Sequence, residues 1–120
     1  MSKIYIKAIL KNENEVHVFE GKGIKNKNKI TYNDDGVITK LTLGENITLE
    51  RTSDYSIKMG FNMNENVKGT YSTKEGIFEL ETKTLDIKEK KDGIKIKYNL
   101  MINKEVIQTF EFYLQYTIDR

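Results

Sequence analysis

The stretch "ITLERTSDYSIKMGF", Ile47 to Phe61, contains two runs in which apolar and polar side chains alternate. Alternate residues of a strand share one face, so the spacing places Arg51 on the apolar face that holds Ile47 and Leu49. The second run repeats the pattern with four residues in one phase: Tyr55, Ile57, Met59 and Phe61. The stretch therefore predicts two strands of one sheet, with a permanently charged side chain aimed at the core.

The same period of two recurs along nearly the whole chain. Apolar residues keep one phase in further runs: Ile4 to Leu10, Val16 to Val18, Val37 to Leu43, Ile94 to Ile102 and Phe110 to Ile118. Short connections rich in Asn, Asp and Gly separate the runs, as tight hairpins require. The pattern predicts one all-β domain over residues 1–120, with about ten strands in an antiparallel up-and-down barrel of about 8–10 strands.

One segment, "GIFELETKTLDIKEK", changes phase near Thr84. Phe78 and Leu80 share the phase of Thr84, whereas Leu85 and Ile87 lie in the other phase. A β-bulge near Thr84 reconciles the two phases and bends the strand as barrel closure demands. The alternative is that the two phases serve opposite faces of the sheet.

The composition excludes several kinds of chemistry. The chain has no cysteine and one histidine, His17, so a zinc site and a histidine-based catalytic site lack their residues. His17 is expected to be a lone surface imidazole in the polar phase, and we expect no enzymatic activity, no metal and no cofactor. No apolar run approaches the roughly 18 residues of a membrane span, and the N-terminus does not resemble a signal peptide. We therefore expect a soluble, cytoplasmic protein.

Polar residues in the apolar phase suggest a site in the barrel interior. The candidate ligand-binding residues are Arg51, Tyr55, Met59, Tyr71, Thr82, Thr84, Tyr98, Gln108 and Tyr116. In one hypothesis Arg51 anchors the carboxylate or phosphate of a small amphipathic or anionic ligand, and the other residues line the wall. In the alternative Arg51 plugs one end of the barrel, with its stem against aromatic rings and its head bound to an internal Glu or Asp.

A second candidate is a basic stretch that contains Lys22, Lys25, Lys27 and Lys29. The alternative function is a protein- or single-stranded RNA-interaction module that uses this basic edge. With Phe19 and Tyr32 nearby, the lysines could hold single-stranded RNA by charge and stacking. The net charge of +2 gives no global field that recruits nucleic acid, so a nucleic-acid partner is not favoured. An open strand edge could instead pair two copies into a homodimer.

Three segments together resemble a known family: "ITLERTSDYSIKMGF", "GTYSTKEGIFELETKTLDI" and "DGIKIKYNL". The resemblance is to the YwiB-like family of small bacterial proteins of unknown function, and it extends from Lys3 to about Tyr116. Family members often have a short Arg-x-Gly turn, whereas "RTSDY" after Arg51 has no glycine, which bears on the turn and not on the fold. The resemblance implies a closed calycin-like barrel, related in shape to lipocalins, and implies no activity or substrate.

Overall fold

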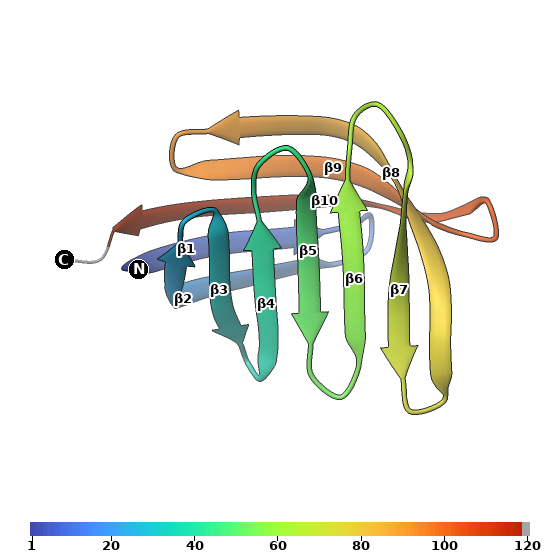
Figure 1. Cartoon of the computed structure of the whole chain (residues 1–120), viewed down its shortest axis with the longest axis horizontal. Coiled ribbons are helices and arrows are strands. Elements are labelled where there is room, and N and C mark those ends of the chain that lie inside the picture. The colour runs from blue at the N-terminus through green and yellow to red at the C-terminus, as the bar shows by residue number, and fades with distance from the viewer. Residues whose placement is uncertain (119–120) are drawn as a thin grey trace.

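The structure is a computed structural model, which describes residues 1–118 (Figure 1). These residues form ten strands and no helix. The strands are β1 (Ser2–Lys11), β2 (Val16–Asn26), β3 (Lys29–Asp34), β4 (Val37–Thr42), β5 (Ile47–Thr52), β6 (Ser56–Phe61), β7 (Val67–Thr73), β8 (Gly76–Lys90), β9 (Gly93–Ile102) and β10 (Glu105–Ile118). The described residues contain no helix that is long and apolar enough to cross a membrane.

The strands close into a barrel in which each strand pairs antiparallel with its neighbours in sequence. Closure comes from β1 and β10, whose register joins Ile4 to Ile118 and Lys11 to Glu111. In Figure 1 the short strands β3 to β7 stand in front, and the longer β1, β2, β9 and β10 run crosswise behind and above them. The predicted all-β up-and-down barrel is confirmed.

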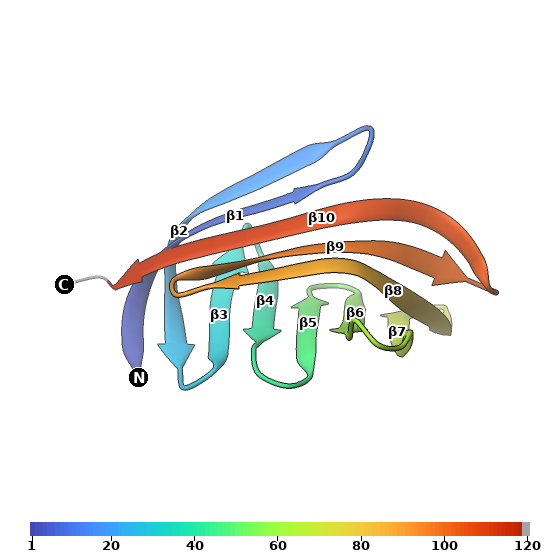
Figure 2. The ribbon, with the colours of Figure 1, turned by 90° about the horizontal axis from the view of Figure 1, so that it is seen from above.

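The bulge expected in the long strand is present. The register between β8 and β9 shifts between Thr84 and Asp86, so that Thr84 pairs with Tyr98 and Ile87 pairs with Ile96. The shift returns apolar side chains to the inner face after the phase change, and leaves Leu85 partly exposed. Strand β8 curves here from the front layer into the layer of β9 and β10 (Figure 2).

Apolar side chains fill the interior of the barrel. Sixteen residues form the buried core: Ile4, Ile6, Ala8, Ile30, Tyr32, Leu41, Ile47, Leu49, Met59, Phe61, Leu80, Ile94, Ile96, Tyr98, Phe112 and Leu114. All belong to the inward phase of their strands, which is the phase that the alternating spacing marked as apolar. Burying these side chains is the main stabilising contribution to the fold.

The junction between β2 and β3 is short. Strand β2 pairs with β1 from Val16 to Lys25, but it pairs with β3 only from Gly23 to Asn26. Figure 2 shows the hairpin of β1 and β2 diverging from β3 toward the hairpin tip. The barrel is therefore closed along most of its wall and split between β2 and β3 at one end, which we call the mouth.

Candidate functional site

Arg51 lies on the inner face of the mouth, near the end of β5. Its register partners are Thr39 on β4 and Ile57 on β6, which places it one step beyond the core residue Leu49. Atom Nη2 of Arg51 lies 3.5 Å from Oδ2 of Asp34, and the arginine side chain is 20% exposed. The charge that the sequence aimed inward thus reaches an internal carboxylate at the barrel rim.

Asp34 links that arginine to His17. Asp34 ends β3, just before a turn in which Asp35 and Gly36 both have positive φ, and its side chain is 8% exposed. Nε2 of His17 lies 2.7 Å from the same Oδ2 atom that Arg51 approaches, so an imidazole N–H donates to the carboxylate. One carboxylate therefore holds together β2, β3 and β5 where the backbone pairing of β2 and β3 has ended.

The guanidinium of Arg51 affects the pKa values of two buried tyrosines. Burial raises the pKa of Tyr32 to about 12, while the nearby positive charge of Arg51 opposes the shift. Burial also raises the pKa of Tyr98, and Arg51 opposes this shift in the same way. Both phenols are therefore neutral hydrogen-bonding groups near the cation, and neither is an activated base.

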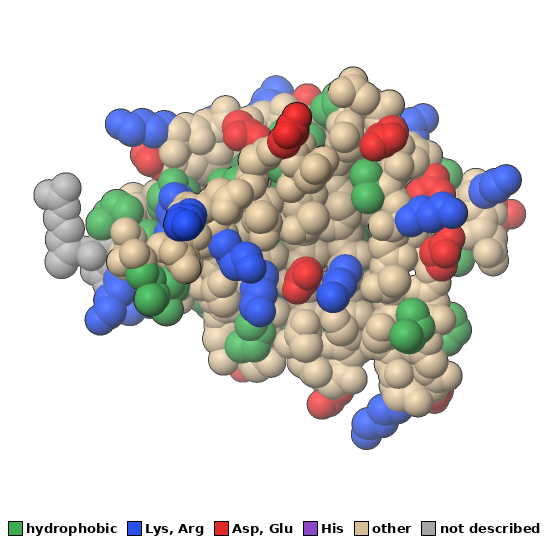
Figure 3. Space-filling view, in the orientation of Figure 1, with side chains coloured by type: hydrophobic (Ala, Val, Ile, Leu, Met, Phe, Trp, Pro, Cys, Tyr) green, Lys and Arg blue, Asp and Glu red, His purple; other side chains and the backbone are tan. Residues whose placement is uncertain are grey.

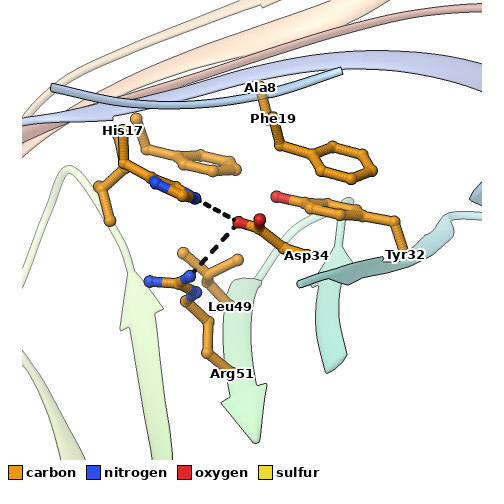
Figure 4. A pocket seen from close by; sticks show the side chains of 9 residues that line it. Ala8, His17, Phe19, Tyr32, Asp34, Leu49 and Arg51 are labelled. Carbon is orange, nitrogen blue, oxygen red and sulfur yellow. Dashed lines mark hydrogen bonds and ion pairs between the residues drawn. The ribbon is translucent and has the colours of Figure 1, made fainter. Parts of the chain in front are cut away.

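The space enclosed at this point is small. A cavity of about 10 Å³ opens between the two sides of the split, which is room for about one water molecule. Figure 4 shows His17 and Phe19 on one side of it and Asp34, Tyr32 and Arg51 on the other. The rings of Phe19 and Tyr32 stack at 4.7 Å between centroids, and so close the inner end of the split.

The guanidinium retains donors that can reach a ligand. Asp34 is its one ion-pair or hydrogen-bond partner among residues 1–118. No side-chain nitrogen or oxygen in this range is both fully buried and without a partner. The remaining N–H groups of Arg51 therefore face solvent at the mouth, where an anion can accept hydrogen bonds from them.

An inward row of side chains runs from the core out to the rim, and we call it the mouth row. Register pairing defines its six members, one from each strand from β3 to β8: Tyr32, Thr39, Arg51, Ile57, Tyr71 and Phe78. Exposure rises along the row from buried Tyr32 to Tyr71 at 37% and Phe78 at 53%. Strands tilt in a barrel, so a row perpendicular to them climbs toward one end.

The mouth row places a cation beside an apolar surface. Ile57 is half-buried next to Arg51, and the rings of Tyr71 and Phe78 lie 6.4 Å apart. Tyr55, from the turn before β6, stacks on Tyr71 at 5.9 Å. An anionic head and an apolar body are thus both accommodated along one line.

Four residues that were predicted to line an interior ligand site pack in the core instead. Tyr98 lies against Phe61 and Phe110, and Met59 is buried among apolar neighbours. The hydroxyl of Thr82 donates to the carbonyl of Gly60, and that of Thr84 accepts from the backbone N–H of Asn62. These four groups find partners within the protein, so they belong to a packed interior and not to the wall of a cavity.

The other expected wall residues lie at the two ends of the barrel. Tyr55 and Tyr71 belong to the rim of the mouth, and Gln108 is half-buried on β10 opposite Leu100. Tyr116 lies toward the opposite end, where its backbone N–H donates to the carbonyl of Asp92. The structure brings together Arg51, Tyr55 and Tyr71 from the predicted set, and it separates Tyr116 from them.

The predicted basic stretch is not a sheet edge. It covers the part of β2 that pairs with β3, together with the turn between them, where Lys27 has a positive φ. Lys22 is opposite Tyr5 on the outer face, whereas Lys25 is half-buried and donates to the carbonyl of Lys27. Lys29 precedes the core residue Ile30 and so points outward. Figure 3 shows acidic and basic side chains interspersed over the front face, without a patch of one sign.

Two residues of this site, His17 and Asp34, were not predicted from the sequence. His17 was expected to be a lone surface imidazole. It is exposed, but it is not alone, because it shares the inward phase of Phe19 and contacts Asp34, and the two valines beside it face outward. Asp34 carried a usable signal, because it follows Ile30 and Tyr32 at even spacing, as Arg51 follows Leu49. Among residues 1–118, no group of three or more His, Asp or Glu side chains could hold a metal ion.

Comparison with known proteins identifies the fold. The model of a family described as a domain of unknown function (DUF1934) matches residues 4–114. The crystal structure of the ywiB protein from Bacillus subtilis superposes with a TM-score of 0.68 at 18% identity, covering 98% of this chain and 91% of that one. A search among curated proteins found no match. At such identity the structural similarity concerns the fold alone.

Proposed function

Because the chain belongs to the DUF1934 family, a YwiB-like family of unknown function, we propose a role from the site itself: non-enzymatic binding of a small amphipathic anion at the mouth. The observation that carries the proposal is the mouth row, in which Arg51 turns N–H donors to solvent beside Ile57, Tyr71 and Phe78. The anion would lie on Arg51, and its apolar part would follow the row outward. The packed interior argues for the rim as the location, in place of the hollow lumen.

Non-enzymatic binding is proposed because the cluster lacks the parts of a catalytic site. Asp34 orients His17, as a carboxylate does in a triad, but its contact with Arg51 commits the same oxygen to a second partner. Tyr32 and Tyr98, the hydroxyl groups near the cation, have raised pKa values that disfavour their ionised, nucleophilic form. These features fit a structural ion cluster that joins strands better than a catalytic centre.

Calorimetric titration with decanoate and with decanol tests the two parts of the proposal, which are the ionic contact with Arg51 and the apolar contact along the mouth row. From Arg51 to Phe78 the row crosses three strand spacings of about 4.8 Å, roughly 14 Å, which suits an extended ten-carbon chain. Decanoate is expected to bind more tightly than decanol to the native protein. Arg51→Gln should abolish this preference and leave decanol binding in place, because only the ionic contact is lost.

A matched pair of neighbours on β8 controls for effects on folding. Phe78→Ser should weaken both ligands about fivefold, since the ligand would cover half of an exposed ring. Ile77→Ser should change neither, because Ile77 is on the outer face of the same strand and is 74% exposed. Equal effects of the two substitutions, or decanoate binding that ignores Arg51, would contradict the proposal.

A further inference from the structure

The split between β2 and β3 leaves one strand edge without a partner. Residues Val16 to Gly21 pair with β1 on one side, and no strand among residues 1–118 pairs with their other side. Every second residue of such a stretch directs its backbone N–H and C=O away from the existing ladder. This edge is therefore a row of backbone donors and acceptors that another strand can satisfy.

The edge lacks several of the devices that usually protect an exposed strand, and its one acidic side chain, Glu20, lies 3.7 Å from the ammonium group of Lys7. Val16 to Gly21 contains no proline, no lysine and no register shift against β1. Val16 and Val18 are exposed on its outer face. On its inner face His17 and Phe19 line the small cavity that Arg51 and Asp34 line from the other side. The edge thus borders the same mouth as the cation.

We infer that the natural ligand of the mouth is an extended peptide segment with an acidic side chain, which adds as a strand to the β2 edge and directs its carboxylate to Arg51. The inference rests on the proposed function and narrows its ligand class. A fatty acid has no amides with which to satisfy the edge, whereas a peptide has the matching backbone. Its inward side chains would lie against Phe19 and Tyr32, which line the cavity beside Arg51.

Charge favours an acidic residue at the inner face. Arg51 and His17 share the single carboxylate of Asp34, and His17 is 54% exposed. A second carboxylate beside them would accept from the solvent-facing guanidinium N–H groups. The titratable groups that face this position are Arg51, Asp34, His17 and Tyr32, so Asp34 is the one competing anion.

Backbone pairing is tested with a synthetic seven-residue peptide, acetylated and amidated, with an aspartate at its centre. Valine occupies the other positions in the phase of the aspartate, and threonine occupies the opposite phase. Binding should slow hydrogen exchange at alternate amides within Val16 to Gly21, measured by NMR, and leave Gly23 to Asn26 unchanged. N-methylation of the peptide in one alternating phase should abolish binding, and in the other phase should have little effect. Equal tolerance of both phases would overturn the inference.

The acidic contact is tested by replacing the central aspartate of the peptide with asparagine. Native protein should bind the asparagine peptide about tenfold more weakly, and Arg51→Gln should bind both peptides alike. If decanoate binds at Phe78 but neither peptide protects the β2 amides, the inference of a peptide ligand is refuted and the proposed function still holds. Protection of the same amides by raised protein concentration alone would show that a second copy occupies the edge, and would overturn the assignment.

Discussion

The two ends of the barrel are built from the same ten strands, yet their inner faces differ. At the opposite end, which we call the floor, Ile4, Ile30, Ile47, Phe61 and Ile94 are buried and apolar. At the mouth, the inward positions of the same strands hold an ion cluster and partly exposed aromatic rings. At both ends side chains bridge the barrel where strand pairing stops. Ion pairs of Asp34 do so at the mouth, and the hydroxyl groups of Thr82 and Thr84 do so at the floor, where the pairing of β6 with β7 ends at Lys58.

The largest expected effect is the difference in stability lost when an aromatic side chain is removed at the floor and at the mouth. Phe61→Ala should lower the free energy of unfolding by about 3–5 kcal/mol, because the ring is buried against Tyr98 and its removal leaves a cavity. Phe78→Ala at the rim should cost less than about 1 kcal/mol. Urea denaturation of both variants measures the difference, and similar costs would show that the two ends do not differ as described.

The ion cluster is expected to give the next largest effect. Arg51→Leu leaves the nearly buried carboxylate of Asp34 with His17 alone, and should cost about 2 kcal/mol, less than a fully buried pair because Arg51 is partly exposed. Adding Asp34→Asn to the same chain should recover part of the loss. Additive costs in a double-mutant cycle by urea denaturation would argue that the two residues do not interact.

Stability measured at alkaline pH tests the contribution of the buried phenol of Tyr32. The pKa of Tyr32 is raised from 10.0 to about 12 in the folded protein, so its stabilising contribution is complete below pH 10 and disappears as the pH rises through 12. Tyr32→Phe should reduce the stability lost between pH 9 and 12 by at most about 2 kcal/mol. Part of the loss should persist through Tyr98.

The smallest expected effect concerns the outer wall. A hydrogen bond from Lys11 lowers the pKa of Glu111 from its ordinary value of 4.5, so this contribution is present above pH 4.5 and is lost as the pH falls through the folded value. Lys11→Met should reduce that acid-induced loss by less than about 0.5 kcal/mol, since solvent screens the pair. Lys7→Met, whose ion pair with Glu20 is longer at 3.7 Å, should have no measurable effect on thermal unfolding between pH 3 and 5.

The part of the candidate site that alternation could predict is the inward direction of Arg51. Its spacing from Ile47 and Leu49 is independent of the other strands, and so is the phase change that places the bulge after Thr84. His17 could not be placed in this way, because both phases around it contain apolar residues. The β1 register settles the choice by pairing His17 with Leu10.

By itself the sequence determined the strand content, the antiparallel barrel, the bulge and the inward charge, because each depends on the pleat of one strand or on the chemistry of one turn. Only the tertiary structure decided that the lumen is filled, that Asp34 and His17 meet Arg51, and that β2 separates from β3. These features depend on volume and on the distance between strands far apart in the chain. Neither quantity is encoded in the spacing of residues along a single strand.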